Sequence, residues 1–500
     1  MIKKIGAKIF AQIIHKKNSK WIKNPLDAQQ NTFNYLIEKA RNTDFGKDHS
    51  FDKIKTHKDF QSSVPVRDYE GLRPYVEKMM KGKPSVLWPG KPLYYAKTSG
   101  TTSGVKYIPL TKESMPTHIT AARDALLNYI HETGNTDFVN GKQIFLQGSP
   151  VLNEKNGNSL GRLSGIVAHY VPKYLQKNRM PSWETNCIED WETKVSKVVE
   201  ETIDQDMGVI AGIPSWVQMY FEKINRQTKK KVSEVFPKFS LFVYGGVNFE
   251  PYRAVFKNLI GKQVDTIELF PASEGFFAYQ DQQNEEGLLL LLNNGIFYEF
   301  IPVDEFGSEN PARYSLAEVK EGINYVLILS TTAGLWGYNI GDTVRFVSTK
   351  PYRLLVTGRV KHFISAFGEH VIGKEVETAM KRATAGTAIR IKEFTVAPQV
   401  APKEGLPYHE WLIEFDVEPD DFQTFAKNLD AAMEAQNVYY KDLIQGNVLR
   451  CLVITPVVRN GFQAYMKSIG KLGGQNKVPR LSNDRKIADA LINLYSNGKQ

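Results

Sequence analysis

The chain has 500 residues, with 64 lysines and arginines against 54 aspartates and glutamates, so its net charge is +10. This length exceeds what one hydrophobic core can organise, and 42% hydrophobic with 24% charged residues is typical of a soluble protein of two or three domains. The only two cysteines, Cys187 and Cys451, lie far apart, which argues against a disulfide framework and leads us to expect a protein of the reducing cytoplasm.

Several classes of protein find no support in the sequence. No C-x-x-C or H-E-x-x-H pattern indicates a metal site built from cysteine or histidine. The basic residues are spread along the chain without a recognisable nucleic-acid-binding signature, so we expect no nucleic-acid partner. A positive balance also suits an enzyme whose substrates are anions. No apolar run is long enough to span a bilayer.

Residues 1–21 combine apolar residues and lysines with the spacing of an amphipathic helix. The apolar positions are Ile2, Ile5, Ile9, Phe10, Ile13 and Ile14. The segment lacks the continuous apolar core and the cleavage site of a signal peptide. We expect this helix to dock on its own domain, and contact with a membrane surface is the alternative.

The most informative segment is Thr98–Lys106, which reads Thr-Ser-Gly-Thr-Thr-Ser-Gly-Val-Lys and follows an apolar run at 93–96. Its glycines let backbone N–H groups approach a polyphosphate, and its hydroxyls and Lys106 supply further donors. It is not a Walker A loop, because three residues separate Gly100 from Gly104 and Tyr107 follows the lysine. A plain surface loop rich in serine and glycine is the alternative.

From residue 93 onward, apolar strands alternate with helical stretches. Strands are expected at 143–147, 207–212, 241–246 and 266–270, with a helix opening at 213–216. This alternation predicts a largely parallel sheet covered on both faces, with ligands beyond the carboxyl ends of its strands. Beyond 286, a hairpin over 287–301 and strands at 325–329 and 343–346 predict a small antiparallel sheet or barrel packed on this core.

A domain boundary is expected near residues 358–361. Residues 1–358 then form a large N-terminal domain, and residues 359–500 form a smaller α+β C-terminal domain with helices near 373–385 and 421–435 and strands near 391–397, 409–417 and 449–457. The predicted fold class is α/β, with mostly parallel sheets and a small antiparallel sheet or barrel in the large domain.

Two segments place polar residues where a nucleotide site needs them. In Phe270–Gly275, Glu274 follows a predicted strand and can hold Mg²⁺ through oxygen, while Phe270 can flank a flat base. A helix start capped by Ser273 and Glu274 is the alternative. In Trp336–Asp342, the acceptor-only carboxylate of Asp342 suits the two hydroxyls of a ribose, and a plain Gly-Asp turn is the alternative.

A third polar segment, Gly470–Arg480, places glycines before Lys477 and a proline after it. Such a loop can move and deliver Lys477 to a site on another domain. An exposed lysine in a surface loop is the alternative.

These four segments occur in the order and approximate spacing of a known family. The chain resembles the acyl acid–amido synthetases of the auxin-responsive-promoter family, within the firefly-luciferase-like adenylate-forming superfamily, from about residue 20 to the end. The resemblance rests on Thr98–Lys106, Phe270–Glu274, Tyr338–Asp342 and Gln475–Arg480, with Gly245-Gly246 after a strand. Three positions depart from the pattern: Phe270 stands where the family usually has tyrosine, and Asn339 stands where the plant enzymes typically have arginine. The run Phe367-Gly368-Glu369 differs from the plant pattern and is closer to that of bacterial relatives.

The resemblance implies an adenylate-forming architecture and a role for each matched residue. It places Ser99, Gly100, Thr101, Thr102 and Lys106 over the phosphates of ATP, Ser273 and Glu274 in the second motif with Glu274 on Mg²⁺, Asp342 on the ribose, Arg359 at the hinge near the nucleotide, and Lys477 as the lysine that enters the site for adenylation.

The implied enzyme is a ligase with ATP and Mg²⁺ as cofactors. It activates a carboxylic acid as an acyl adenylate and transfers the acyl group to an amine, which we expect to be an amino acid. Coenzyme A as the acceptor, or nucleotide binding without catalysis, remain alternatives. We expect a monomer. The sequence does not identify the acid, and Trp216, Tyr244, Phe276 and Trp336 are candidate walls of its pocket that can equally be core residues.

Overall fold

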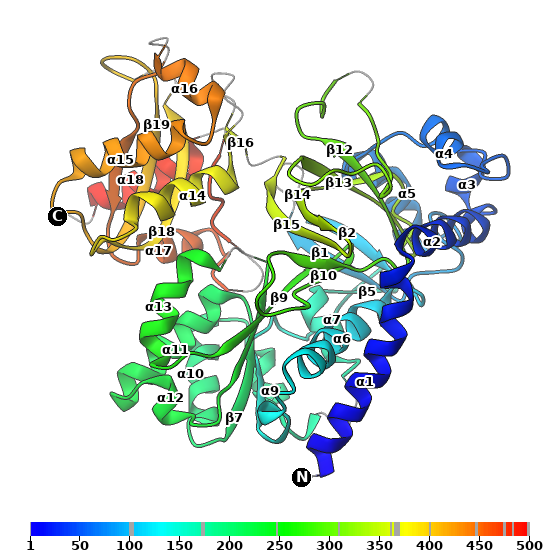
Figure 1. Ribbon diagram of the computed structural model, residues 1–500, viewed down its shortest axis with the longest axis horizontal. Helices are drawn as coiled ribbons and strands as arrows, with labels where there is room; N and C mark the ends of the chain where they lie inside the picture. The colour runs from blue at the N-terminus through cyan, green and yellow to red at the C-terminus, as the bar shows by residue number, and fades with distance from the viewer. Residues whose placement is uncertain are drawn as a thin grey trace. The chain divides into compact units, whose positions relative to one another are not determined.

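The computed structural model describes residues 2–99, 105–171, 176–246, 249–308, 311–360, 363–364, 371–399, 402–445, 449–473, 477–482 and 485–497. The chain forms two compact units. Unit 1 comprises Met1–Val247 and Val255–Val356, and unit 2 comprises Asn248–Ala254 and Thr357–Gln500. Figure 1 shows the elements of each unit.

The first 80 residues of unit 1 are helical, and beyond the first helix this was not predicted. The helices are α1 (Ile2–Lys23), α2 (Pro25–Ala40), α3 (Asp44–Asp48), α4 (His57–Ser63) and α5 (Tyr69–Met80). Short polar caps begin three of them: Thr43 starts α3, a reciprocal pair of Thr56 and Asp59 starts α4, and Asp68 starts α5. α1 packs along α6 (Met115–Thr133), which confirms the expected docking of the amino-terminal helix on its own domain.

The centre of unit 1 is one 11-stranded sheet in the order β12-β13-β14-β15-β11-β10-β9-β8-β7-β3-β6. Its parallel part contains β3 (Lys142–Phe145), β6 (Arg179–Met180), β7 (Met207–Ala211), β8 (Leu241–Gly245) and β9 (Asp265–Ala272). All four predicted parallel strands are present, so the α/β class is confirmed.

Helices and one 3-10 turn connect these strands or lie between them. They are η1 (Asp137–Asn140), α7 (Leu163–Ala168), α9 (Trp183–Cys187), α10 (Trp191–Thr202), α11 (Pro214–Thr228), α12 (Val232–Val235) and α13 (Glu250–Ile260). α6 packs on β9 and β10, and α10 packs on α11. No helix among the described residues is both long and apolar enough to cross a membrane.

The antiparallel strands continue the same sheet. They are β10 (Gly275–Tyr279), β11 (Leu288–Leu290), β12 (Ile296–Pro302), β13 (Asn324–Thr331), β14 (Tyr338–Thr349) and β15 (Tyr352–Arg359). The predicted hairpin over 287–301 is wrong: β11 pairs with β10 and β15, whereas β12 pairs with β13. A turn does occur there, with Gly295 at φ +69, but it carries the chain to the edge of the sheet.

A second, four-stranded sheet has the order β2-β1-β5-β4. It contains β1 (Tyr94–Ser99), β2 (Val105–Leu110), β4 (Asn153–Lys155) and β5 (Asn158–Gly161). The β1–β2 pair is antiparallel, and β1 is parallel to β5. This sheet was not predicted, apart from the strand that precedes the glycine-rich segment.

Unit 2 is built on a three-stranded sheet of β18 (Arg390–Gln399), β19 (Tyr408–Val417) and β20 (Val453–Val457). Its helices are α14 (Gly373–Thr384), α15 (Phe422–Glu434), α16 (Val438–Gln445), α17 (Gly461–Ser468) and α18 (Lys486–Asn497), and β16 (Phe363–Ile364) pairs with β17 (Val371–Ile372). Trp411 and Ile413 point into one hydrophobic cluster and Leu412 into another. Alternating side chains therefore bury both faces of this sheet, in agreement with the predicted α+β pattern.

Candidate functional site

The glycine- and hydroxyl-rich segment is flanked by two paired antiparallel strands. β1 and β2 pair with Thr98 opposite Lys106 and Ser99 opposite Val105. The predicted phosphate-binding residues Gly100, Thr101 and Thr102, and the side chain of Ser99, lie outside the described residues. The described strands hold both ends of the segment, and Lys106 lies in β2 opposite Thr98.

Lys106 lies against the tyrosine that begins α5. Its Nζ is 5.8 Å from the centre of the Tyr69 ring, and the backbone N–H of Tyr107 donates to the Tyr69 hydroxyl at 2.9 Å. Asp68 caps the same helix, since its carboxylate accepts from Glu70 N at 3.0 Å and Gly71 N at 3.4 Å. Burial raises the pKa of Tyr69, which keeps its hydroxyl protonated.

The second segment is a hairpin turn. β9 ends at Ala272 and β10 begins at Gly275, with these two residues paired across the turn, so Ser273 and Glu274 are the whole connection. The alternative of a helix start at this point is therefore wrong. Ser273 is buried. At Gly275 a Cβ atom would come within 2.6 Å of Ile296 Cδ1, so a side chain there would require the end of Ile296 to move.

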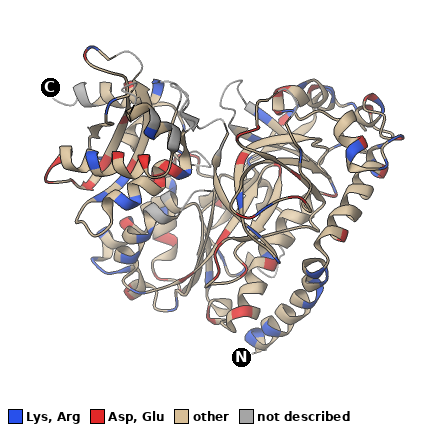
Figure 2. Ribbon diagram, turned by 45° about the horizontal axis from the view of Figure 1, so that its top comes forward, with Lys and Arg blue, Asp and Glu red and all other residues tan. Residues whose placement is uncertain are grey.

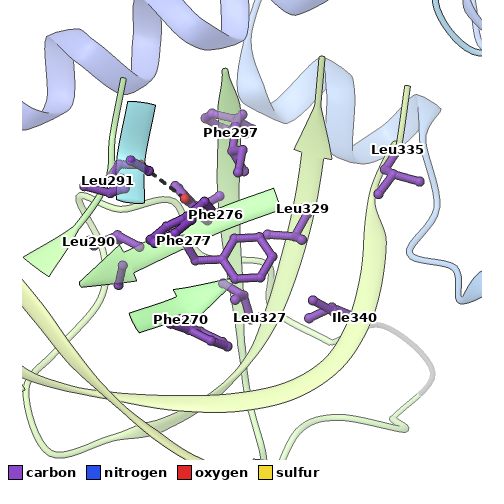
Figure 3. Close-up of a cluster of buried hydrophobic side chains, with 14 of the residues drawn as sticks. Phe270, Phe276, Phe277, Leu290, Leu291, Phe297, Leu327, Leu329, Leu335 and Ile340 are labelled. Carbon is purple, nitrogen blue, oxygen red and sulfur yellow. Dashed lines mark hydrogen bonds between the residues drawn. The ribbon is translucent and has the colours of Figure 1, made fainter. Parts of the chain in front are cut away.

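Phe270, the first residue of this segment, is a core residue. It is 7% exposed, and its ring meets that of Phe277 edge to face, with the ring centres 5.0 Å apart. Figure 3 shows both rings in a buried apolar cluster with Phe276, Leu327 and Leu329. The candidate walls of the acid pocket are equally buried: Trp216, Tyr244, Phe276 and Trp336 are at most 5% exposed.

The third segment contains an irregularity that sequence analysis interpreted only as a glycine turn. In the β13–β14 pair, Asn339 opposes Ile328 and Thr343 opposes Val326. Three residues, 340–342, therefore face the single residue Leu327, and the strand bulges. Gly341 supplies φ +90, and its N–H donates to Asn339 Oδ1 at 2.8 Å. Asp342 lies half-buried at the end of this bulge.

One hydrogen bond joins the second and third segments. The Tyr338 hydroxyl donates to Glu274 Oε1 at 3.4 Å. Burial first, and then the negative charges of Glu274 and Asp68, raise the pKa of Tyr338 well above its ordinary value, so the phenol remains a donor. Arg67 forms an isolated parallel β-bridge with Tyr338, so the start of α5 lies beside this tyrosine.

The first three segments therefore meet in unit 1, and two tyrosines connect them. Lys106 contacts Tyr69 at the start of α5, Arg67 just before that helix forms a bridge with Tyr338, and Tyr338 binds Glu274. Sequence analysis missed Asp68 and Tyr69. Asp68 carries the signal that could have indicated them, because an aspartate three residues before an apolar helical stripe is typical of a helix start.

In unit 2, the segment after Lys477 is fixed on the edge of β18. The hydroxyl of Thr395 donates to the carbonyl of Pro479 at 2.7 Å, and Val396 N donates to the carbonyl of Arg480 at 2.9 Å. The guanidinium of Arg480 bonds the carboxylates of Glu377 and Glu393 and lies over the ring of Phe394, 4.6 Å from its centre. Lys477 itself is exposed, two residues before this anchored stretch.

The remaining predicted residue, Arg359, is the last residue of β15, and its side chain lies outside the described residues. Across the described ranges, no group of three or more histidines, cysteines, aspartates or glutamates gathers in the manner of an all-protein metal cage. Glu274 fits a different type of site, in which Mg²⁺ is held by one or two carboxylates together with the phosphates of a nucleotide.

Comparison with known proteins covers most of the chain. Models of the N-terminal, central and C-terminal domains of the GH3 family match residues 15–168, 289–359 and 374–486. The jasmonoyl–L-amino acid synthetase JAR4 of Nicotiana attenuata is 21% identical over 386 residues, which span 63% of this chain and 66% of that protein. The chain thus spans just under two thirds of the length of this relative.

Two solved structures share the fold. The GH3.15 acyl acid amido synthetase in complex with 2,4-DB has a TM-score of 0.80 at 15% identity, covering 97% of this chain and 96% of that one. A 2-hydroxyisobutyryl-CoA ligase in complex with 2-HIB-AMP has a TM-score of 0.59 at 14% identity, covering 96% and 93%. The first matches the described fold more fully than the second.

Proposed function

The chain belongs to the GH3 family, and from that premise we propose that it is an ATP-dependent ligase that joins a carboxylic acid to an amine, with an amino acid as the acceptor. The observation that carries the proposal is the contact between Glu274 and Tyr338, because it joins two segments that the sequence matches separately to a nucleotide site. Lys106 reaches the same place through Tyr69.

In the first half-reaction, a carboxylate oxygen of the acid attacks the α-phosphorus of ATP and pyrophosphate leaves. Both reactants are anions, so positioning and neutralisation of charge dominate the catalysis. Lys106, together with Ser99, Gly100, Thr101 and Thr102, holds the phosphates in this proposal. Asp342 accepts hydrogen bonds from the ribose hydroxyls, and it lies in the bulge where residues 340–342 oppose Leu327.

Glu274, with Ser273 beside it, is the residue that would hold Mg²⁺. The ion, when bound, neutralises charge on the phosphates and on the leaving pyrophosphate. The Tyr338 hydroxyl fixes one carboxylate oxygen of Glu274, and the short turn leaves that side chain few alternative directions. These contacts orient the carboxylate before a nucleotide arrives, as preorganised sites require.

In the second half-reaction, the amine nitrogen attacks the carbonyl carbon of the acyl adenylate, and AMP leaves as the amide forms. Lys477 belongs to unit 2 and is proposed to enter the site for adenylation. The C-terminal domain, residues 359–500, turns about the segment at 358–361 between the two steps, with Arg359 contacting the nucleotide near this hinge. Gly358, at φ +155, offers a backbone that other residues rarely adopt.

Coenzyme A is the second candidate acceptor, since a CoA ligase shares the fold. The first half-reaction is then unchanged, and a thioester replaces the amide. The other partners in the proposal are a small carboxylic acid and an amino acid, and the protein is a monomer of the cytoplasm, where its two cysteines, both free, would stay reduced.

The test is to incubate the protein with ATP, Mg²⁺ and a library of carboxylic acids, and to measure the release of AMP and pyrophosphate. Active acids are then paired with the amino acids or with coenzyme A, and the products are identified by mass. We expect amides. A thioester as the only product would assign the CoA ligase activity, and no acid-dependent AMP release from any member of a broad library would contradict the proposed chemistry.

A further inference from the structure

The amino-terminal helix α1 has one face that packs on unit 1, the docked face, and one that is exposed, the open face. Its docked face consists of Ala11, Ile14, Asn18 and Trp21, which are buried. Asn18 Nδ2 donates to Asp124 Oδ2 of α6 at 3.3 Å, and the ring of His15 stacks on that of His131 with the centres 3.7 Å apart. These contacts hold the helix along the side of unit 1, where Figure 1 shows it as a long rod in dark blue.

The open face carries an apolar row. Ile2, Ile5, Ile9 and Ile13 are 87%, 54%, 54% and 57% exposed, and Phe10 beside them is 39% exposed. Their spacing of three, four and four residues places the isoleucines on one side of the helix. Among the 16 large apolar residues that are exposed in the described part of the chain, these five fall within twelve consecutive residues, so they form a patch rather than scattered exposures.

The charge of α1 has one sign. The helix contains seven lysines and no aspartate or glutamate. Lys4 pairs with Asp137 of η1, while Lys16 and Lys20 continue the row of Ile13 toward the carboxyl end at the same spacing. Lysines colour the amino end of the helix blue in Figure 2. The open face therefore presents apolar side chains together with long, flexible lysine side chains, whose ammonium groups can extend beyond the apolar row.

We propose that the outer face of α1, defined as Ile2, Ile5, Ile9, Ile13, Lys8, Lys16 and Lys20, docks on the surface of an anionic lipid bilayer with the helix axis parallel to the membrane. The isoleucines can insert among the lipid acyl chains, while the flanking lysines contact the negatively charged headgroups. The isoleucines of the row carry no hydrogen-bonding group, and beside them Gly6 adds no side chain and has nothing within 4 Å of a Cβ built there.

The test is flotation of the full chain with vesicles of phosphatidylcholine alone and of phosphatidylcholine with about one third phosphatidylglycerol. We expect binding to the anionic vesicles only, with at least tenfold weaker binding at high salt. The triple variants Ile5→Ser/Ile9→Ser/Ile13→Ser and Lys8→Gln/Lys16→Gln/Lys20→Gln should each lose at least tenfold. The matched control Ile323→Ser, a 43%-exposed isoleucine elsewhere in unit 1, should bind like the wild type.

Because the substituted side chains are exposed, circular dichroism should show folded variants. Failure of the wild-type chain to float with either vesicle, or equal flotation of the triple variants, would overturn the proposal. Light scattering tests whether a second copy of the chain covers this face instead. If the wild type is a dimer that does not bind vesicles, and the triple isoleucine variant is a monomer, the row is a dimer interface and the proposal is overturned.

Discussion

At the scale of single residues, the bulge that carries Asp342 gives the sharpest prediction for nucleotide binding. Replacing Asp342 by alanine should weaken ATP binding about tenfold to a hundredfold, because charged hydrogen bonds contribute about 1.5–3 kcal/mol. Gly341→Ala should weaken binding as well, since the backbone at φ +90 strains any other residue and the bulge would relax. Titration calorimetry measures both.

The control for the bulge is Ser348→Ala, a change near the far end of the same strand. Unchanged ATP affinity in Asp342→Ala would refute the proposed contact with the ribose. If Asp342→Ala weakened ATP binding but Gly341→Ala did not, the Asp342 carboxylate would be positioned by something other than the backbone conformation of Gly341.

A second prediction at this scale concerns pH. Burial lowers the pKa of His118 to about 4 from 6.5, and its Nδ1 has no partner in the described structure. The unfolded chain therefore binds more protons below pH 6.5, so the free energy of unfolding should fall as the pH drops from 6.5 toward 4. At pH 5 the expected loss from this group is about 2 kcal/mol.

Urea unfolding of the wild type and of His118→Gln, near pH 7.5 and near pH 5, measures this loss. The variant should show a smaller decrease, because glutamine does not titrate. His169→Gln, which alters an exposed imidazole, is the control. An identical decrease in the wild type and the His118 variant would show that other groups cause the acid sensitivity.

At the scale of elements, the edge of β18 positions the segment that carries Lys477. Thr395→Val keeps the volume of the side chain and removes only the hydrogen bond to the carbonyl of Pro479, a contribution of about 1 kcal/mol. We expect pyrophosphate exchange to slow severalfold while the unfolding of unit 2 changes little. Thr384→Val, which removes a similar bond inside α14, is the control and should leave exchange unchanged.

If Thr395→Val exchanged pyrophosphate at the wild-type rate, the hydrogen bond from Thr395 would not be needed to position Lys477, and the contacts of Arg480 would suffice. The ion pairs of Arg480 with Glu377 and Glu393 are less suitable for this test, because breaking a buried pair destabilises a fold by about 3–5 kcal/mol and can unfold the unit.

Helices and strands were predictable where a short stretch of sequence carries their hydrophobic pattern. The parallel strands β3, β7, β8 and β9 are short apolar runs between helices, and that pattern predicts both the strands and their parallel arrangement. The pairing of β11 and β12 was not predictable, because the turn at 293–295 looks the same whether the next strand returns beside β11 or goes to the edge. Tertiary packing decides between them.

At the scale of the whole molecule, the proposed reaction needs both units. Lys477→Ala should therefore slow adenylation on the order of a hundredfold, since one lost charge contact in a transition state contributes about 3 kcal/mol. ATP binding should change little, because Lys106, Glu274 and Asp342 all belong to unit 1. Acid-dependent pyrophosphate exchange and calorimetry measure the two effects, and exchange at the wild-type rate would remove Lys477 from the mechanism. Lys471→Ala, a change in the same part of unit 2, is the control.

The candidate site was only partly predictable at this scale. Motif spacing indicated Glu274 and Asp342 separately, but nothing in the sequence tells that a tyrosine four residues before Asp342 reaches Glu274 across the sheet. That contact depends on a bulge and on a two-residue turn, which are set by pairing registers between strands far apart in the chain. The start of α5 carries a local signal in Asp68, but its place beside the site was missed because Tyr338, which pairs with Arg67, lies about 270 residues away.

The turn between β9 and β10 restricts how this protein can change over generations. Ser273 and Glu274 join β9, in which Ile267 and Phe270 are buried, to β10, in which every residue is buried, and side chains in a strand alternate between its two sides. Adding or deleting a single residue there inverts one strand if the pairing register shifts with it, and sends its apolar rings to the wrong side. Lineages of this protein can therefore exchange the amino acids at this corner more readily than they can change its length.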